Sequence, residues 1–292
     1  MELAGWRARA RGIALFALVL LLSGGCGNDT PADRGPGMAR LGDVPDSTWA
    51  AFAHERVFFG HQSVGWNIME GAGELVRDRP ALGLRIVEGD SAADGQPAFA
   101  HAPVGRNGDP QGKTDDFASR IEGGLGGRVD IALHKYCFAD IHPGTDAQSV
   151  FEHYRTTMAR LHTEYPGVVF VHVTTPLVTA RAGGLKLLVQ RLLGRAPTRV
   201  GSNIARERFN DLLRKEYTGR EPLFDLALLE STRPDGRREG VAFGGNPGWS
   251  LVPGYSSDGS HLNEPGRRRI AEAFLVFLAR LPAGHGAAAA SH

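Results

Sequence analysis

The succession of apolar segments predicts an α/β fold in which a mostly parallel sheet lies between two layers of helices. Short, nearly continuous apolar runs alternate along the chain with longer segments whose apolar residues recur every three or four positions. The clearest run covers residues 168–173, and such continuous apolarity is typical of a strand buried on both faces. Repeated strand–helix alternation gives parallel strands with helices on both sides. We therefore expect a three-layer α/β/α sandwich.

Five segments have the composition of strands. Residues 56–59 form the first run, residues 84–87 a weaker second one, and residues 128–133 are apolar enough to lie centrally. Residues 168–173 follow, and residues 223–229 make the last run. Ligands bind beyond the carboxyl ends of the strands in such sheets, so we expect site residues to follow strands.

Four segments have the period of helices. Residues 67–77 place five apolar side chains on one face, and apolar residues then step by three and four between residues 151 and 161. A third helix is expected at residues 204–217, and the last at residues 270–281, where six apolar residues are in register.

The first 25 residues predict an export signal. Three arginines within residues 7–11 precede an uninterrupted apolar run at residues 13–22, and small residues continue to Cys26. An apolar run this short is typical of a cleaved signal peptide and not of a spanning helix. The boundary resembles a bacterial lipobox, in which the cysteine is acylated. We expect a lipoprotein of the bacterial cell envelope, held to the membrane only by a lipid on Cys26; the alternative is a secreted or periplasmic protein.

Composition and charge limit the domain organisation and the partners. Residues 26–46 are rich in Gly, Pro and Asp and predict a flexible tether, residues 47–283 have the size of one domain, and residues 284–292 form a tail. The chain carries a formal net charge of +1, and residues 1–25 contribute three arginines and one glutamate, so the remainder is near −1. Such a balance does not favour nucleic acid. With Cys26 acylated, no disulfide framework is possible, because one other cysteine remains.

Ser63 is the first candidate for catalysis. It lies in Gly-His-Gln-Ser-Val-Gly at residues 60–65, after the first strand and before the first helix. A hydroxyl there can face the ligand-binding edge, while N–H groups of the turn and the helix N-terminus face a developing anion. A serine in this position is also an ordinary N-cap, although no Glu or Gln follows to complete a capping box.

Asp258 and His261 supply what a serine nucleophile needs. A base must accept the hydroxyl proton, and an acceptor must orient that base through its other ring nitrogen. An aspartate three residues before a histidine in one glycine-containing turn offers both, and Pro265 suits the first turn of the helix that follows. An isolated Asp-x-x-His is more often a plain solvated turn. The chain has no Gly-x-Ser-x-Gly, which argues against an α/β-hydrolase.

Together these blocks resemble the SGNH (GDSL-like) hydrolase family. The likeness consists of an early strand with Gly-x-x-Ser-x-Gly, the alternating elements, and Asp-Gly-x-His-Leu-Asn-x-x-Gly at residues 258–266 before the last helix. His61-Gln62 precede the serine, where the family usually has Gly-Asp. Asn203 and Asn210 also lie where similar proteins place such residues. The resemblance implies a flavodoxin-like three-layer fold and serine-dependent ester hydrolysis or acyl transfer, with no metal or organic cofactor.

The resemblance also implies an oxyanion hole made of the Ser63 N–H, a glycine N–H and an asparagine side chain. Within residues 107–114 we expect Gly112 to supply the glycine N–H, with Gly108 as the alternative. The asparagine position is open, because Ala139 stands there and has no donor. The hole has two donors, or the third is one of Asn107, Lys135 and Tyr136. Losing one such donor typically costs about 10²–10³ in rate.

Other residues permit other chemistry. Cys137 at a strand end could be a thiol nucleophile, but free cysteines are more often small buried apolar residues, which we favour. His134 and His142 lack the spacing and the acidic partners of a metal site. Residues 184–194 form a basic amphipathic stretch that is either a lid over the site or a plain helix. The glycine-rich loop at residues 243–255 suits a rim facing carbohydrate.

These features predict an exported serine esterase that acts on an acyl or acetyl ester of a carbohydrate or a lipid. Ser63 attacks the acyl carbon, His261 moves the proton, and Asp258 orients the imidazole. Two alternatives remain open: an O-acyltransferase that uses the same three residues, and a non-catalytic binding lipoprotein that kept the fold.

Overall fold

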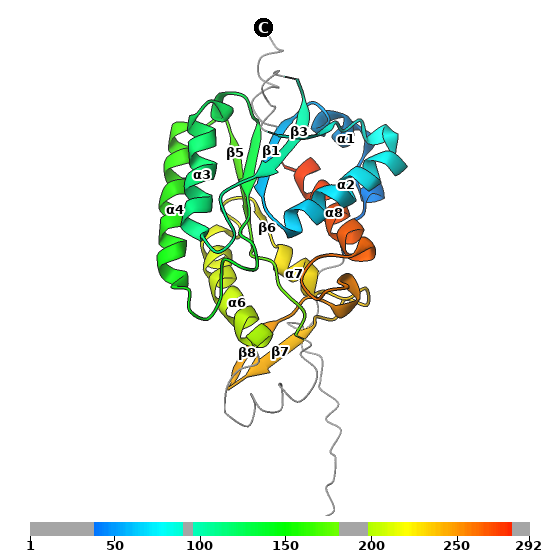
Figure 1. The fold of residues 1–292 in the computed structure, drawn as a ribbon. Helices are drawn as coiled ribbons and strands as arrows, with labels where there is room; N and C mark the ends of the chain where they lie inside the picture. Colours follow the sequence, from blue (N-terminus) through cyan, green and yellow to red (C-terminus); the bar gives the residue numbers. More distant parts are fainter. Residues whose placement is uncertain (1–37, 90–95, 181–197, 282–292) are drawn as a thin grey trace, which may run out of the picture.

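The computed structural model describes residues 38–89, 96–180 and 198–281 (Figure 1). The expected signal peptide, the lipidation site at Cys26, the basic stretch at residues 184–194 and the tail at residues 284–292 lie outside these stretches. No helix within the three described stretches combines the length and the apolarity needed to cross a bilayer.

Six parallel strands form the centre of the molecule. Their spatial order is β2-β3-β1-β4-β5-β6, and every adjacent pair is parallel. In chain order the strands are β1 (Arg56–His61), β2 (Ile86–Glu88), β3 (Ala98–Pro103), β4 (Ile131–His134), β5 (Val169–Val173) and β6 (Leu223–Phe224). All carboxyl ends therefore meet at one edge of the sheet. The predicted α/β class with a mostly parallel sheet is confirmed.

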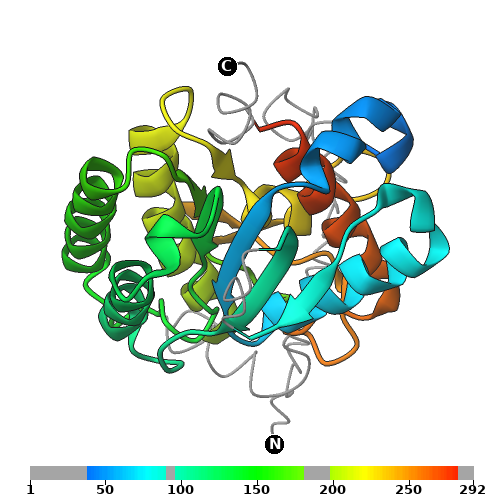
Figure 2. The same ribbon diagram turned by 90° about the horizontal axis from the view of Figure 1, so that it is seen from above.

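Helices cover both faces of this sheet (Figure 2). The first face carries α1 (Asp46–Phe52), α2 (Val64–Asp78), α7 (Leu226–Ser231) and α8 (Glu264–Ala279). The second carries α3 (Pro110–Glu122), α4 (Ala147–Glu164) and α6 (Thr198–Tyr217). Alternate residues of β1 supply the two apolar cores, since Val57 and Phe59 belong to the first and Phe58 to the second.

Short elements complete the fold. An antiparallel hairpin of β7 (Gly240–Phe243) and β8 (Asn246–Trp249) stands apart from the main sheet. Single 3₁₀ turns occur at η2 (Leu41–Asp43), η3 (Pro80–Leu82), η5 (Leu125–Gly127) and η6 (Pro253–Tyr255). The last of these precedes the turn that contains His261.

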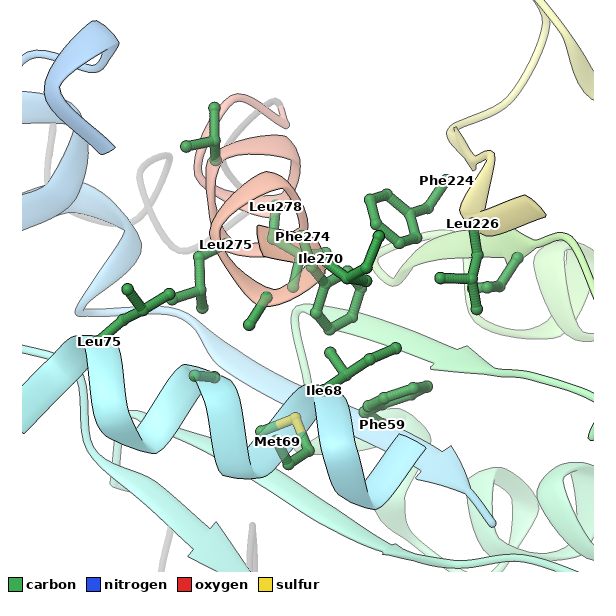
Figure 3. Close-up of a cluster of buried hydrophobic side chains, with 14 of the residues drawn as sticks. Phe59, Ile68, Met69, Leu75, Phe224, Leu226, Ile270, Phe274, Leu275 and Leu278 are labelled. Atoms are coloured by element: carbon green, nitrogen blue, oxygen red, sulfur yellow. The ribbon is translucent and has the colours of Figure 1, made fainter. Parts of the chain in front are cut away.

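The first core holds α2 and α8 together and thereby fixes the two elements that flank the candidate site. Phe274 of α8 lies 5.3 Å, ring centre to ring centre, from Phe59 of β1, and Ile68 of α2 joins them (Figure 3). Gly71 allows the close approach, because a Cβ at this position would lie 2.6 Å from the main-chain oxygen of Arg267. The start of α2 and the start of α8 are therefore rigidly related.

Several elements differ from the expectation. The strand β3 was not expected, because its Ala-Phe-Ala-His-Ala sequence contains no β-branched residue; pairing with β1 and β2 on either side buries it. The run at residues 223–229 is not one strand. Asp225 interrupts it, and its carboxylate accepts a hydrogen bond from Leu228 N at 3.1 Å and caps α7. The helices α1 and α3 and the β7–β8 hairpin were also not expected.

The predicted boundary between tether and domain, at residue 46, lies too late in the chain. Leu41 and Val44 are 2% and 5% exposed and belong to the first core, although residues 26–46 were assigned to the tether. Glu272 of α8 fixes this segment, because its carboxylate accepts a hydrogen bond from Leu41 N at 2.9 Å. The ordered domain therefore begins before residue 47. The polar composition around these two apolar residues concealed their burial.

Candidate active site

Ser63 lies at the carboxyl edge of the sheet, between β1 and α2. It is the only residue other than glycine with a positive φ in the described stretches, with φ 52° and ψ −111°. Such a conformation costs about 1–3 kcal/mol and persists where the surrounding structure imposes it, often at functional sites. Gly65 permits the tight turn, because a Cβ there would collide with the His61 side chain. The hydroxyl is thereby presented at the start of α2.

The three residues expected to cooperate lie side by side. Ser63 Oγ is 2.8 Å from His261 Nε2, and His261 Nδ1 is 2.7 Å from Asp258 Oδ2. The carboxylate can only accept, so Nδ1 carries the proton and Nε2 presents its lone pair to the serine hydroxyl. This is the tautomer that a base needs in order to remove the proton from Ser63.

Asp258 is held by its own turn. Its Oδ1 accepts hydrogen bonds from Ser260 N at 2.7 Å, His261 N at 2.8 Å and Ser256 Oγ at 3.2 Å. Partial burial raises the pKa of the carboxyl, but the hydrogen bonds from His261 and Ser260 outweigh it and lower the pKa well below its ordinary value. Asp258 therefore stays ionised next to the imidazole. The side chains of His261 and Asp258 remain 45% and 56% exposed, so the site is open to solvent.

Neighbouring elements fix the turn that carries His261. Gly259 O accepts hydrogen bonds from Thr179 N at 2.9 Å and from Arg199 Nη1 at 2.8 Å. Leu262 N donates to Asn67 Oδ1 of α2 at 3.2 Å, and the Phe138 ring meets His261 edge-on at 5.5 Å. None of these supporting residues was predicted from the sequence. No local pattern marks them, because each comes from a different part of the chain.

The last residues of the motif at residues 258–266 have a structural role at the start of α8. Asn263 caps α8, since its Oδ1 accepts a hydrogen bond from Gly266 N at 3.0 Å. Gly266 must be small, because a Cβ there would collide with the main-chain oxygen of Tyr255. The motif at residues 258–266 therefore begins α8 a few residues after His261.

Two buried asparagines shape the loop after β5. Asn203 exchanges hydrogen bonds with the main chain of Val178, and Asn210 does the same with Thr175. Both side chains are fully buried. They hold the loop that leads to Thr179, and through it they support the His261 turn. Within the part of the chain that the structure describes, neither side chain forms a hydrogen bond with Ser63, Asp258 or His261.

The two glycines expected at the oxyanion hole already have partners. Gly112 N lies in the first turn of α3 and donates to Asp109 Oδ1 at 2.9 Å, so the geometry does not support its predicted role. Gly108 N donates to Asp140 Oδ1 at 2.7 Å. The helix that Asp109 caps was not expected at this point, so the partner of the Gly112 N–H was not expected either.

Asn107 is better placed to donate. Its Oδ1 accepts a hydrogen bond from Lys113 Nζ at 2.8 Å, which leaves the Nδ2 amino group facing away from the lysine. Lys113 is fully buried and forms an ion pair with Asp140 at 2.5 Å. The Asn107 side-chain amide is therefore held in place by a fixed, buried cation. Asn107 follows β3, the neighbour of β1, and therefore belongs to the same edge as Ser63.

The two remaining donor candidates point elsewhere. The Tyr136 hydroxyl is 2.6 Å from Thr114 Oγ1, and burial raises the pKa of Tyr136 above the ordinary range of a tyrosine. Lys135 Nζ donates to the main-chain oxygens of Gln62 at 3.0 Å and Tyr136 at 3.2 Å. Neither group reaches out over the sheet edge.

Cys137 and His134, two candidates for other chemistry near this edge, are enclosed. Cys137 is fully buried, and its N–H donates to Asp140 Oδ2 at 2.5 Å. His134 is also buried, and burial lowers its pKa to about 3. The described stretches contain no group of three or more His, Cys, Asp or Glu side chains arranged to hold a metal ion.

Trp249 in the glycine-rich loop is partly covered. The guanidinium of Arg238 lies 3.7 Å from the ring centre, a cation–π contact on one face of the indole. The Trp249 side chain also packs against the first core and is partly buried. The surroundings of Trp249 therefore give no support to the expectation that the loop at residues 243–255 is a rim facing carbohydrate.

Comparisons with known proteins show similarity of architecture only. No protein-family model and no curated protein matches the sequence. Among solved structures, a carbohydrate esterase family 3 protein from Talaromyces cellulolyticus aligns at 12% identity and a TM-score of 0.44, over 77% of this chain and 98% of the other. A lipase/acylhydrolase from Enterococcus faecalis aligns at 12% identity and a TM-score of 0.43, over 77% and 95%. At these levels the likeness says nothing about activity, which has to follow from the side chains.

Proposed function

We propose that this chain is a serine-dependent ester hydrolase. The observation that carries the proposal is the continuous contact from Ser63 Oγ through the His261 ring to the ionised Asp258, at 2.8 Å and 2.7 Å. Each contact has the length required for proton transfer or for orientation of the base. The strained backbone at Ser63 adds support, because strain of this kind is retained where it positions a reacting group.

The chemistry proceeds in two balanced steps. Ser63 Oγ attacks the acyl carbon while His261 Nε2 accepts the hydroxyl proton, and the same proton then passes to the leaving alcohol. In the second step water attacks the acyl-enzyme, His261 accepts a proton from the water, and Ser63 is regenerated with the free acid. Asp258 stabilises the imidazolium in both steps.

The oxyanion is stabilised by the Ser63 N–H at the start of α2 and by the Asn107 amino group. The helix N-terminus adds the positive end of its dipole. This assignment replaces the expected glycine N–H with an asparagine from the loop after β3. It accounts for the alanine at position 139, because the donor comes from a different strand end.

The substrate class we propose is a short acyl or acetyl ester carried by a larger carbohydrate or lipid molecule. The side chains of His261 and Asp258 are about half exposed, so a bulky alcohol can remain in solvent while the acyl group reaches Ser63. A buried triad would favour a small, fully enclosed substrate.

The test uses the mature protein and an acetyl chromogenic ester. Ser63→Ala and His261→Ala should each lower kcat by about 10⁴-fold or more, because the nucleophile and its base act as a unit. Ser260→Ala and His142→Ala are matched controls: neither side chain takes part in the proton relay, and both variants should retain full turnover.

A second readout identifies the nucleophile and separates hydrolysis from transfer. A fluorophosphonate probe should label the wild-type protein at Ser63 and should not label Ser63→Ala. Unchanged turnover in both Ser63→Ala and His261→Ala would refute the proposal. Product analysis with an added sugar alcohol distinguishes the acids formed by a hydrolase from the new esters formed by an acyltransferase.

A further inference from the structure

Lys135 is a buried cation directly beneath the turn that presents Ser63. The residue is 1% exposed, and its ammonium donates to the main-chain oxygens of Gln62 and Tyr136. Within the described stretches it forms no ion pair. Burying an ammonium with only carbonyl partners is costly, and such costs are usually retained at positions with a role. The role of Lys135 is indicated by its contact with the main-chain oxygen of Gln62, the residue before Ser63.

The Gln62 carbonyl belongs to the same peptide unit as the Ser63 N–H. A trans peptide is planar, so its C=O and N–H point in opposite directions, and the described stretches contain no cis peptide. The contact from Lys135 Nζ holds the oxygen toward the interior at 3.0 Å. The Ser63 N–H is therefore directed away from Lys135.

Two further contacts hold the same residue. The Gln62 main-chain oxygen also accepts a hydrogen bond from Gly65 N at 3.1 Å, and the Gln62 side chain donates to Gly105 O at 2.9 Å. Three contacts therefore hold the turn at Gln62, and only the one from Lys135 comes from a charged group. A hydrogen bond from a cation to C=O polarises the peptide and makes its N–H a stronger donor.

We propose that Lys135 is a positioning residue that orients and polarises the Gln62–Ser63 peptide, so that the Ser63 N–H stabilises the oxyanion. This inference rests on the proposed ester hydrolysis. The resemblance had left Lys135 open as a direct donor; in the structure it acts one peptide away from the reacting oxygen.

The charge on Lys135 depends on its surroundings. Burial lowers its pKa to about 8. The ionisable groups around it come from five elements or loops: Cys137 and Asp140 beyond β4, Lys113 of α3, Glu230 of α7, His61 of β1 and His134 of β4. Among these, Cys137 and Asp140 favour the charged form, Glu230 does so once it is ionised, and Lys113 opposes it. Loss of the charge above pH 8 should weaken the Ser63 N–H as a donor.

The kinetic test compares Lys135→Met with Tyr136→Phe. Lys135→Met removes the cation and keeps most of the side-chain volume, and should lower kcat by about 10- to 100-fold with KM nearly unchanged. Tyr136→Phe removes a buried hydroxyl at the same strand end without touching the Gln62–Ser63 peptide, and should retain kcat. In the wild-type protein kcat should fall above pH 8, and Lys135→Met should lack this fall.

A spectroscopic readout does not depend on activity. In protein labelled with ¹⁵N-serine, the Ser63 amide signal, assigned by its absence from Ser63→Ala, should move as the pH passes about 8. It should not move in Lys135→Met. If the wild-type signal stays fixed through this range, the inference is overturned whether or not the protein has esterase activity. If the signal moves but the wild-type protein shows no turnover, the proposed function is overturned instead, and with it the catalytic consequence of the peptide's orientation.

Discussion

Ser63 joins a reactive hydroxyl to a backbone conformation that suits glycine. Its φ of 52° and ψ of −111° place Cβ in a crowded position, and the surrounding hydrogen bonds to Gln62 hold it there. The strain aims the hydroxyl at His261, which a serine in ordinary N-cap geometry would not do. At this single residue, the backbone conformation that lowers the stability of the fold is the one that orients the hydroxyl for the proposed reaction.

Replacing Ser63 should reveal the strain. Ser63→Gly and Ser63→Ala both remove the hydroxyl and its contact with His261, but only glycine relieves the backbone. We expect Ser63→Gly to be more stable than Ser63→Ala by about 1 kcal/mol, after the greater flexibility of glycine in the unfolded chain is subtracted. Urea unfolding of the two inactive proteins measures the difference. An alanine variant as stable as the glycine variant would show that the turn stores no strain.

The candidate residues differ in how well the sequence could predict them. Asp258 and His261 share one turn, so their spacing alone placed them together, and Ser63 followed from its place between a strand and a helix. Gly112 was wrongly expected as a donor because the partner of an N–H depends on the whole turn, and Asp109 occupies it. Arg199 left no local sign, since its contact with Gly259 O exists only after α6 meets the turn.

At the scale of elements, α2 and α8 form the most extensive contact among the described helices, and each begins at a candidate catalytic segment. Gly71 lies in their contact, where a Cβ would be 2.6 Å from Arg267 O. Gly73, two residues further along α2, faces outward, and its nearest neighbour would be the flexible end of Arg77 at 3.4 Å. The two glycines therefore serve different purposes in one helix.

Alanine at these two positions should have opposite effects. Gly71→Ala should lower the free energy of unfolding by about 1–3 kcal/mol, because the helices must move apart around the new methyl group. Gly73→Ala should leave it unchanged or raise it by about 0.5–1 kcal/mol, because alanine is the better helix former. Thermal or urea unfolding of both variants tests this. Equal effects would mean that Gly71 does not govern the α2–α8 approach.

Helices and strands were predictable from the sequence where a long apolar periodicity exists. They were not predictable where contacts with distant segments determine the secondary structure. The helix α8 and the strand β5 lie close to their expected positions, because many residues repeat one pattern. The strand β3 depends on partners from distant sequence, and β6 is cut short by the Asp225 cap. A local pattern cannot show which of two compatible structures a distant partner will stabilise.

At the scale of the whole molecule, several buried ionisable groups lie beneath the carboxyl edge of the sheet. Glu230 of α7 is fully buried; its Oε2 accepts a hydrogen bond from Leu177 N at 2.6 Å, and its Oε1 has no hydrogen-bond partner among the described residues. Burial raises the pKa of Glu230 to about 8, although Lys135 and Arg206 oppose this. The folded protein therefore holds a proton here that the unfolded chain releases at lower pH.

This proton should make global stability depend on pH. Since the folded pKa of about 8 lies above the ordinary value of 4.5, the folded state binds more protons between these limits, and stability is lost as the pH rises through them. The wild-type free energy of unfolding, relative to Glu230→Gln, should fall by up to about 1.4 kcal/mol per pH unit over this window. Urea unfolding of both proteins at pH 5, 6, 7 and 8 measures it. A difference that does not change with pH would mean that Glu230 is ionised throughout.

The sequence by itself determined the α/β class and the identity of the serine, aspartate and histidine, because these depend on local periodicity and on short spacings. The export signal and the lipid on Cys26 stay predictions from the sequence. Only the tertiary structure decided the partners of the other candidate groups: Asp109 accepts from the Gly112 N–H, Lys113 holds the Asn107 amide, and Lys135 lies beneath the Gln62–Ser63 peptide. Such contacts join residues from separate strand ends, and the parallel sheet brings those ends to one edge only when the chain is folded.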